Sequence, residues 1–380
     1  MAIYLDNHAT TPCDPRVVEA MLPFFTEIYG NPSSSIHEAG KKAARAVDSA
    51  RQQVASLINA DPKEIIFTSG ATESNNLAIM GLVNGNKSKR RRIVTTPIEH
   101  KSILEVCKET KIYGYEIQFL KIDKMGLVDL DFAREIINQD TLLVSVQAAN
   151  NEIGTIQNVR TLVNIAHNEG AFFHTDAAQA VGKIPVSAYN WDFDLLSISS
   201  HKLYGPKGVG SLFVRPDVSL KPIIRGGGQE LNIRSGTLNV SGIVGLGMAC
   251  QICSSLMDEE EIRIALLRDV LEEKLLNGIR NLKINGAIDY RLPGNSSITF
   301  PGIDAEALIV NLPELDLSVG SACSTGALEP SYVLTSIGLS RGDAYSTLRV
   351  GLGRFTTMEE IQTASDLIIN AYNRLIDIEN

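Results

Sequence analysis

Short apolar segments alternate with amphipathic helical segments between about residues 40 and 215. Apolar residues recur at spacings of three and four from Ala43 to Ile58, which predicts a helix with one buried face that ends before Pro62. Six further apolar runs are typical of buried strands, at residues 65–67, 92–94, 142–146, 171–173, 195–198 and 211–214. Because helical stretches separate most of these runs, the pattern predicts an α/β fold with a largely parallel sheet.

The pattern changes near Glu259, where a charged helix over 259–278 is expected, followed by short strands and further helices. The chain has 380 residues, and domains of roughly 150 residues are typical, so two domains are expected. We expect a large domain over residues 16–258 and a smaller α+β domain over 259–380. The N-terminal segment, residues 1–15, is expected to pack with the smaller domain.

The charge balance disfavours several classes of partner. Lys and Arg number 35 and Asp and Glu number 44, so the net charge is −9, the opposite of what nucleic acids and anionic membranes attract. The uncharged stretch 235–257 contains four glycines and several polar residues, so no membrane-spanning helix is expected there. The N-terminus lacks a signal-peptide pattern, and five cysteines at irregular spacing indicate a reduced, cytoplasmic protein.

One basic run departs from this balance. It extends from Lys87 to Arg92 and directly precedes an expected strand. Such runs are more often solvated loops than nucleic-acid contacts, so nucleic acid is not an expected partner.

The residues that follow the expected strands carry the candidate chemistry, because ligands of open α/β sheets bind beyond the carboxyl ends of the strands. The small and hydroxyl residues of 68–74 predict either an anion cradle or an ordinary capped helix start. Asp176 and Lys202 each end an apolar strand, where an unpaired charge is costly. Asp176 is a candidate functional carboxylate or a helix cap. A buried Lys202 that loses its charge would be an amine nucleophile for carbonyl groups.

A histidine and three cysteines need separate interpretation. His100 ends another expected strand, and a single histidine is more often a structural hydrogen-bond partner than a catalyst. Cys250 and Cys253 lie in a stretch that resembles a buried helix and are interpreted as core packing, not as a metal or redox site. Cys323 lies among the small residues of 318–326, which favours an exposed, reactive thiol.

Nine segments together resemble the NifS/IscS-like cysteine desulfurases, in the class V aminotransferase group of enzymes that use pyridoxal 5′-phosphate (PLP). The resemblance spans nearly the whole chain, and its specificity comes from the order of many matches. The segments are 4–12, 30–34, 68–73, 150–154, 176–179, 199–208, 234–238, 320–323 and 328–331.

The resemblance implies the fold type I of PLP-dependent transferases, with a mostly parallel mixed sheet flanked by helices, and it assigns site residues. Lys202 would bind PLP covalently and move protons, Asp176 would pair with the pyridine nitrogen, and His100 would stack on the ring and shuttle a proton. Asn151 and Arg349 would bind the substrate, with Arg349 clamping its carboxylate. The other implied cofactor-binding residues are Ala71, Thr72, Gln179, Ser199, Ser200, His201 and, from a partner subunit, Thr237.

The activity implied is conversion of L-cysteine to L-alanine, with Cys323 as the nucleophile that takes up sulfur as a persulfide. The partners implied are L-cysteine, a sulfur acceptor such as an iron–sulfur scaffold or a thiolation relay, and a second copy of the chain. No metal is expected in the resting enzyme, although the Cys323 persulfide is a candidate ligand for a transferred iron–sulfur cluster. Val319 and the pair Ser324-Thr325 depart from the residues frequent in the family around this cysteine.

Three alternatives stay open. A selenocysteine lyase of the same fold would discriminate against cysteine, and an aminotransferase of the same fold would stay active without Cys323. A non-catalytic scaffold would have lost Lys202 or Asp176, and both are present.

Overall fold

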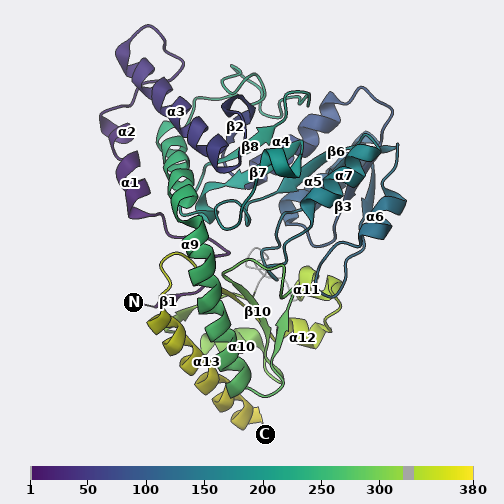
Figure 1. The fold of residues 1–380 in the computed structure, drawn as a ribbon, viewed down its shortest axis with the longest axis vertical. Coiled ribbons are helices and arrows are strands. Elements are labelled where there is room, and N and C mark those ends of the chain that lie inside the picture. The colour runs from purple at the N-terminus through teal and green to yellow at the C-terminus, as the bar shows by residue number, and fades with distance from the viewer. Residues whose placement is uncertain (1, 320–328, 380) are drawn as a thin grey trace.

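The computed structural model describes residues 2–319 and 329–379, so Cys323 lies outside the described residues. A large sheet and a small sheet occupy opposite ends of the molecule, and one long helix runs beside both (Figure 1). The large sheet has seven strands, all parallel except β8, which runs antiparallel to both of its neighbours. In spatial order they are β2 (Ile65–Thr68), β8 (Gly210–Val214), β7 (Leu195–Ser199), β6 (Phe172–Asp176), β5 (Thr141–Ser145), β3 (Arg92–Thr95) and β4 (Glu116–Phe119).

Helices cover both faces of the large sheet, which explains why its strands are apolar throughout. Consecutive residues of a strand point to opposite faces, so Ile65 and Phe67 of β2 join one core cluster while Ile66 joins another. The first cluster includes residues of α3 (Glu38–Leu57), α6 (Leu130–Ile136) and α7 (Val159–Asn168), and the second includes residues of α4 (Ala71–Gly85) and α5 (Lys101–Thr110). The predicted α/β fold with a largely parallel sheet is confirmed.

The expected helix over 259–278 is the second half of a longer helix, α9 (Val240–Gly278), which has 39 residues. The first half packs into the core of the large sheet through residues such as Leu246 and Cys253, and the second half packs into a separate core through Leu267 and Leu271. The change of composition near Glu259 therefore marks a change of packing partner and not an interruption of the helix. The division at residues 258–259 stays a prediction.

A window of α9 is long and apolar enough to cross a membrane, judged by length and composition alone. Half of that window is buried inside the protein, and α9 packs against α3 and against α1 (Pro15–Met21). Cys250 and Cys253 are free and buried within it, as core packing requires. These contacts are those of a core helix.

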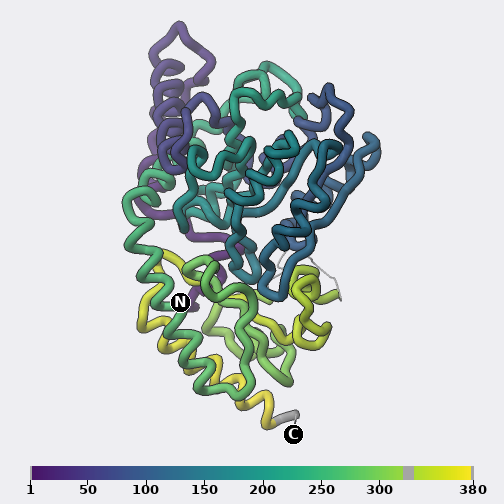
Figure 2. The backbone as a smooth tube through the Cα atoms, turned by 45° about the vertical axis from the view of Figure 1, so that its right-hand side comes forward, coloured from purple at the N-terminus to yellow at the C-terminus, as the bar shows by residue number. Residues whose placement is uncertain are grey.

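The small sheet is antiparallel, in the order β12 (Thr347–Gly351), β10 (Asn295–Thr299) and β9 (Lys283–Asn285). Helix α13 (Met358–Glu379) lies beside the second half of α9 (Figure 2). At the N-terminus, β1 (Ile3–Tyr4) pairs in parallel with β11 (Leu315–Asp316), and Leu5 is buried in the same core as the small sheet. The remaining helices are α2 (Pro23–Thr26), α8 (Ala188–Trp191), α10 (Ala305–Val310), α11 (Tyr332–Ser336) and α12 (Arg341–Tyr345).

Two glycines shape the turn between β2 and α4. Gly70 has φ +145°, a conformation that L side chains rarely adopt. A Cβ on Gly210 would lie 2.4 Å from the carbonyl oxygen of Ile198 and 2.7 Å from Gly70 Cα. Gly70 therefore permits the backbone conformation of the turn, and the absence of a side chain at Gly210 lets the turn approach strand β8 closely.

Candidate active site

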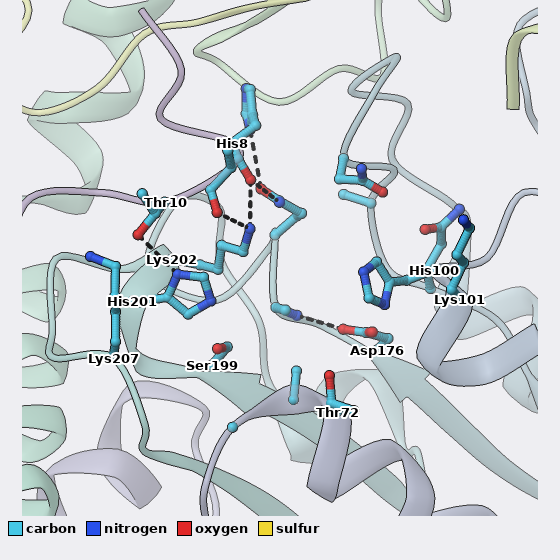
Figure 3. A pocket seen from close by; sticks show the side chains of 18 of the residues that line it. His8, Thr10, Thr72, His100, Lys101, Asp176, Ser199, His201, Lys202 and Lys207 are labelled. Carbon is cyan, nitrogen blue, oxygen red and sulfur yellow. Dashed lines mark hydrogen bonds between the residues drawn. The ribbon is translucent and has the colours of Figure 1, made fainter. Parts of the chain in front are cut away.

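A cavity of about 580 Å³ lies at the carboxyl ends of the parallel strands. Residues that follow β2, β3, β5, β6 and β7 line it, together with the N-terminal segment and Arg349 of the small sheet. Ten of its side chains are labelled in Figure 3. The site therefore lies where an open α/β sheet binds its ligands.

Lys202 ends the turn after β7 and points toward the N-terminal segment. Its Nζ lies 2.6 Å from the carbonyl oxygens of both His8 and Ala9 (Figure 3). It stands across the cavity from Asp176 and beside His201. The amine is thus held by main-chain acceptors inside the cavity.

Asp176 is the last residue of β6 and is 8% exposed. Its Oδ1 accepts a hydrogen bond from the backbone N–H of Ala178 at 3.0 Å, and its Oδ2 accepts one from Asn75 Nδ2 at 2.8 Å. Two donors therefore offset part of the cost of burying this carboxylate.

The turn before α4 has the features of an anion cradle. Its N-cap residue, Gly70, supplies no side-chain cap, so the first backbone N–H groups of α4 are not satisfied by one. Ala71, Thr72 and Ser199 line the cavity at this end. Of these, Thr72 and Ser199 are labelled in Figure 3.

His201 lies beside the cradle, and its Nδ1 is 3.1 Å from Thr10 Oγ1. Burial, and after it the nearby charge of Lys202, lower the pKa of His201 to about 4. His201 is therefore neutral near pH 7 and can act as a hydrogen-bond donor or acceptor.

His100 stands at the start of α5, near Asp176 (Figure 3). Burial lowers its pKa below the ordinary histidine value, against the opposing effect of Asp176. The imidazole of His100 is therefore mostly neutral near pH 7. The residue before it, Glu99, is fully buried, and burial raises the pKa of the Glu99 carboxyl group to about 8.

Gln179 is held by groups on both sides of its carboxamide. Its Nε2 donates to the carbonyl oxygen of His8 at 2.9 Å, and its Oε1 lies 2.8 Å from Lys183 Nζ. A lysine ammonium only donates, so the carboxamide oxygen must face Lys183. The amide N–H₂ therefore faces the main-chain carbonyl of His8.

Arg349 of β12 enters the cavity from the small sheet and is 3% exposed. Its guanidinium donates to Asp6 Oδ1 and Ser318 Oγ at 2.8 Å, and to the carbonyl oxygen of Asn151 at 3.1 Å. These acceptors come from the N-terminal segment, the residues that follow β11 and the turn that follows β5. Asn151 and Arg349, which the resemblance assigns to substrate binding, both line the cavity.

Three residues predicted from the sequence are not seen at the cavity. Ser200 is buried, and its Oγ has no hydrogen-bond partner among the described residues. Thr237 is exposed and lines a different hollow, with Tyr29 and Asn31. Cys323 lies outside the described residues.

Several lining residues were not singled out from the sequence. His8 and Thr10 belong to the polar run that follows β1, and that run of polar side chains was the available signal. Glu73 also lines the cavity; its carboxylate accepts hydrogen bonds from Ser69 N–H at 2.7 Å and from Arg234 Nε at 2.9 Å. Tyr332, whose hydroxyl donates to the carbonyl oxygen of Glu99, carried no signal in the sequence.

The donor set fits PLP, which is an aromatic aldehyde with a phosphate group. Lys202 supplies an amine for the aldehyde, and the glycine turn with Thr72 and Ser199 supplies hydroxyl and backbone donors for a phosphate. Asp176 supplies a carboxylate for the ring nitrogen, on the side of the cavity opposite Lys202.

Comparisons with known proteins agree with this arrangement. Residues 3–363 match the family model described as aminotransferase class-V. The chain is 46% identical to a cysteine desulfurase IscS of Rickettsia felis over 380 residues, which cover 100% of this chain and 93% of that protein.

Two solved structures are similar over almost the same length. A NifS-like protein shares 37% identity at a TM-score of 0.91, covering 97% of this chain and 99% of its own. A structure described as SspA in complex with cysteine shares 35% identity at a TM-score of 0.82, covering 93% of this chain and 100% of its own.

Proposed function

The chain belongs to the class-V aminotransferase family, and we propose that it works as a PLP-dependent cysteine desulfurase in which Lys202, Asp176 and Cys323 divide the chemistry. Enzymes of this family depend on PLP, and relatives similar over the full length are cysteine desulfurases. The substrate is L-cysteine, and the products are L-alanine and a sulfur atom carried by the enzyme.

The coenzyme, when bound, supplies an electron sink that stabilises negative charge beside the reacting carbon. Lys202 would hold it covalently and afterwards move protons at the substrate Cα. Asp176 would keep the pyridine nitrogen protonated, and its two hydrogen-bond donors support a charged carboxylate there. Ala71, Thr72, Ser199 and His201 would bind the phosphate, and Gln179 would donate to the oxygen on the ring.

Arg349 and Asn151 would bind the substrate. A guanidinium presents two parallel N–H donors to a carboxylate, and Arg349 extends from the small sheet into the cavity. Its present acceptor, Asp6, is itself a carboxylate, which supports recognition of a carboxylate at this position.

Cys323 would be the sulfur acceptor. Its thiolate attacks the substrate sulfur and forms a new S–S bond, while the Cβ–S bond breaks and its electron pair stays on the carbon. A proton then completes the methyl group of alanine, and His100 and Lys202 line the cavity where that proton is delivered. The persulfide on Cys323 would pass its outer sulfur to a protein acceptor, such as an iron–sulfur scaffold or a thiolation relay, in the cytoplasm.

The enzyme would act as a homodimer. Thr237 is exposed and lies away from the Lys202 cavity of its own chain, which supports a role at the phosphate of a partner subunit. Large apolar side chains near the same hollow, including Tyr29 at 74% exposure, are consistent with a covered surface.

The observation that carries the proposal is the placement of Lys202 and Asp176 on opposite sides of one cavity, at the ends of the adjacent strands β7 and β6. The purified protein with PLP should be yellow, and borohydride should fix the coenzyme to Lys202. Given L-cysteine and a reductant, it should release alanine and sulfide in equal amounts.

Matched variants separate this activity from the alternatives. Lys202→Ala should lose the covalent link to the coenzyme, whereas Lys207→Ala, at a lysine on the rim of the same cavity, should keep it. Cys323→Ser should still bind L-cysteine and change colour, yet release little sulfide. A Cys323→Ser variant that transfers amino groups at the wild-type rate would indicate an aminotransferase, and a wild-type protein that accepts only selenocysteine would indicate a lyase.

A further inference from the structure

His100 caps the helix that it begins, and this contact determines which ring nitrogen carries the proton. The backbone N–H of Ser102 donates to His100 Nδ1 at 3.1 Å, as an N-cap contact of α5. A backbone N–H only donates, so Nδ1 must present its lone pair. In the neutral ring the proton is therefore on Nε2.

The hydroxyl of Ser102 makes a second contact to the same nitrogen, with Oγ 2.8 Å from His100 Nδ1. On its other side, Ser102 Oγ lies 2.8 Å from Asn75 Nδ2. Because the Asn75 amide donates to Oγ, the hydroxyl hydrogen is available for Nδ1. Both contacts to Nδ1 then come from donors.

The orientation of Asn75 follows from its other neighbour. Its Nδ2 lies 2.8 Å from Asp176 Oδ2, and a carboxylate only accepts hydrogen bonds. The opposite amide orientation would place Asn75 Oδ1 against that carboxylate. Asn75 is fully buried, so this repulsion would not be relieved by water. The direction of donation is therefore set along the whole chain of side chains.

We propose that Ser102 and Asn75 are positioning residues that hold His100 as the neutral tautomer protonated on Nε2 and connect it to Asp176 through one continuous hydrogen-bond chain. Protonation of Nδ1 would place a hydrogen against the Ser102 backbone N–H, which would have to be released, and would reverse the direction of the contact to the Ser102 hydroxyl. His100 therefore offers a proton from Nε2 and does not serve as a base through Nδ1. This inference deepens the proposed function, because it assigns His100 the role of donor in the same site.

The charges that face His100 act in both directions. Asp176 favours the charged imidazolium, whereas Lys202, Lys101 and the N-terminal end of α5 disfavour it. The two donors at Nδ1 add to the second group. Burial is the largest cause of the lowered His100 pKa, and the two donors at Nδ1 act in the same direction, against the nearby carboxylate.

The test is ¹⁵N NMR of the histidine side chains in the purified coenzyme-loaded protein, with the His100 signals assigned from a His100→Gln variant. We expect an unprotonated Nδ1 and a protonated Nε2 at pH 8, where the ring is neutral. Removal of one donor in Ser102→Ala should raise the His100 pKa by roughly 0.5–1, since one hydrogen bond to the neutral form is lost. Ser102→Thr, which keeps the hydroxyl, should behave as the wild type does.

The connection to Asp176 is tested with Asn75→Ala and the double variant. If Asn75 acts through Ser102, the two changes in His100 pKa should not add. A wild-type ring protonated on Nδ1, or an unchanged pKa in Ser102→Ala, would overturn the proposal. This spectrum does not depend on turnover: a protein that lacks desulfurase activity but shows the Nε2 tautomer would contradict the proposed function and leave the tautomer assignment standing.

Discussion

Lys183 Nζ lies 2.8 Å from Gln179 Oε1. This second lysine does not line the cavity, but its hydrogen bond orients the carboxamide of Gln179, which does. Burial, and after it the charge of Lys202, lower the pKa of Lys183 to about 7. Gln179 in turn contacts both the main chain and the imidazole of His8. The charge of Lys183 is therefore linked to the N-terminal segment that holds Lys202.

The first prediction concerns this titration. As the pH rises through about 7, Lys183 loses its proton, and its hydrogen bond to Gln179 weakens because charge-assisted bonds are the stronger ones. The visible absorbance of the coenzyme-loaded protein should change with a midpoint near pH 7. Lys183→Met should abolish that change, and Lys183→Arg should keep the low-pH spectrum, because arginine stays charged. An unaltered midpoint in Lys183→Met would show that another group titrates.

The second prediction concerns Arg349. Lysine at this position keeps the positive charge but loses the paired donors of the guanidinium. Loss of one charge-assisted hydrogen bond costs about 1.5–3 kcal/mol, so Arg349→Lys should raise KM for L-cysteine about 10- to 150-fold. Arg341→Lys, at an exposed arginine paired with Glu329, is the matched control and should leave KM unchanged. An unchanged KM in Arg349→Lys would remove Arg349 from the substrate site.

The third prediction concerns stability in acid. Hydrogen bonds from Arg16, and then from Arg354, lower the pKa of Asp14 to about 2, although burial opposes this shift. An unfolded Asp titrates near 3.9, so Asp14 stabilises the folded state above about pH 4 and loses this contribution as the pH falls toward 2. The free energy of unfolding in urea should therefore fall less steeply between pH 5 and pH 3 in Asp14→Asn than in the wild type.

The control for this measurement is Asp131→Asn, because Asp131 is 97% exposed in its ion pair with Arg134. This variant should retain the pH dependence of the wild type. Equal slopes for Asp14→Asn and the wild type would mean that Asp14 does not titrate differently in the two states.

The fourth prediction concerns the partner subunit. If Thr237 completes the phosphate site of another copy, Thr237→Val should weaken PLP binding, while a variant of the exposed Thr335 should not. Mixed dimers provide the sharper experiment. A dimer of one Lys202→Ala chain and one Thr237→Val chain has both changes in one site if Thr237 acts across the interface, so the other site stays intact and binds PLP normally. If Thr237 acts within its own chain, each site carries one change and normal binding is lost.

The sequence predicted those parts of the molecule that depend on local pattern. The apolar runs mark six of the seven strands of the large sheet. Strand β4 was missed because it is an edge strand with exposed Glu116 and Phe119 at its ends, so it lacks the continuous apolar run. The length of α9 was underestimated because its two halves pack into different cores and have different compositions.

The site was predictable where the topology alone brings residues together. Asp176 is the last residue of β6 and Lys202 follows the adjacent parallel strand β7, and the carboxyl ends of such strands meet at one edge of the sheet. The hydrogen bonds of Ser102 and Asn75 were not predictable, because they join two helices that start near the same edge and depend on side-chain orientation. His8 was missed because no periodicity places the N-terminal segment beside Gln179.

The most direct test of the division between Lys202 and Cys323 is mass spectrometry of the peptide that contains Cys323, isolated after brief exposure of the PLP-loaded enzyme to L-cysteine. We predict that this peptide gains one sulfur atom, that peptides with Cys13 or Cys107 do not, and that Lys202→Ala yields no modified peptide. An unmodified Cys323 peptide in an enzyme that still produces alanine would contradict the proposed function.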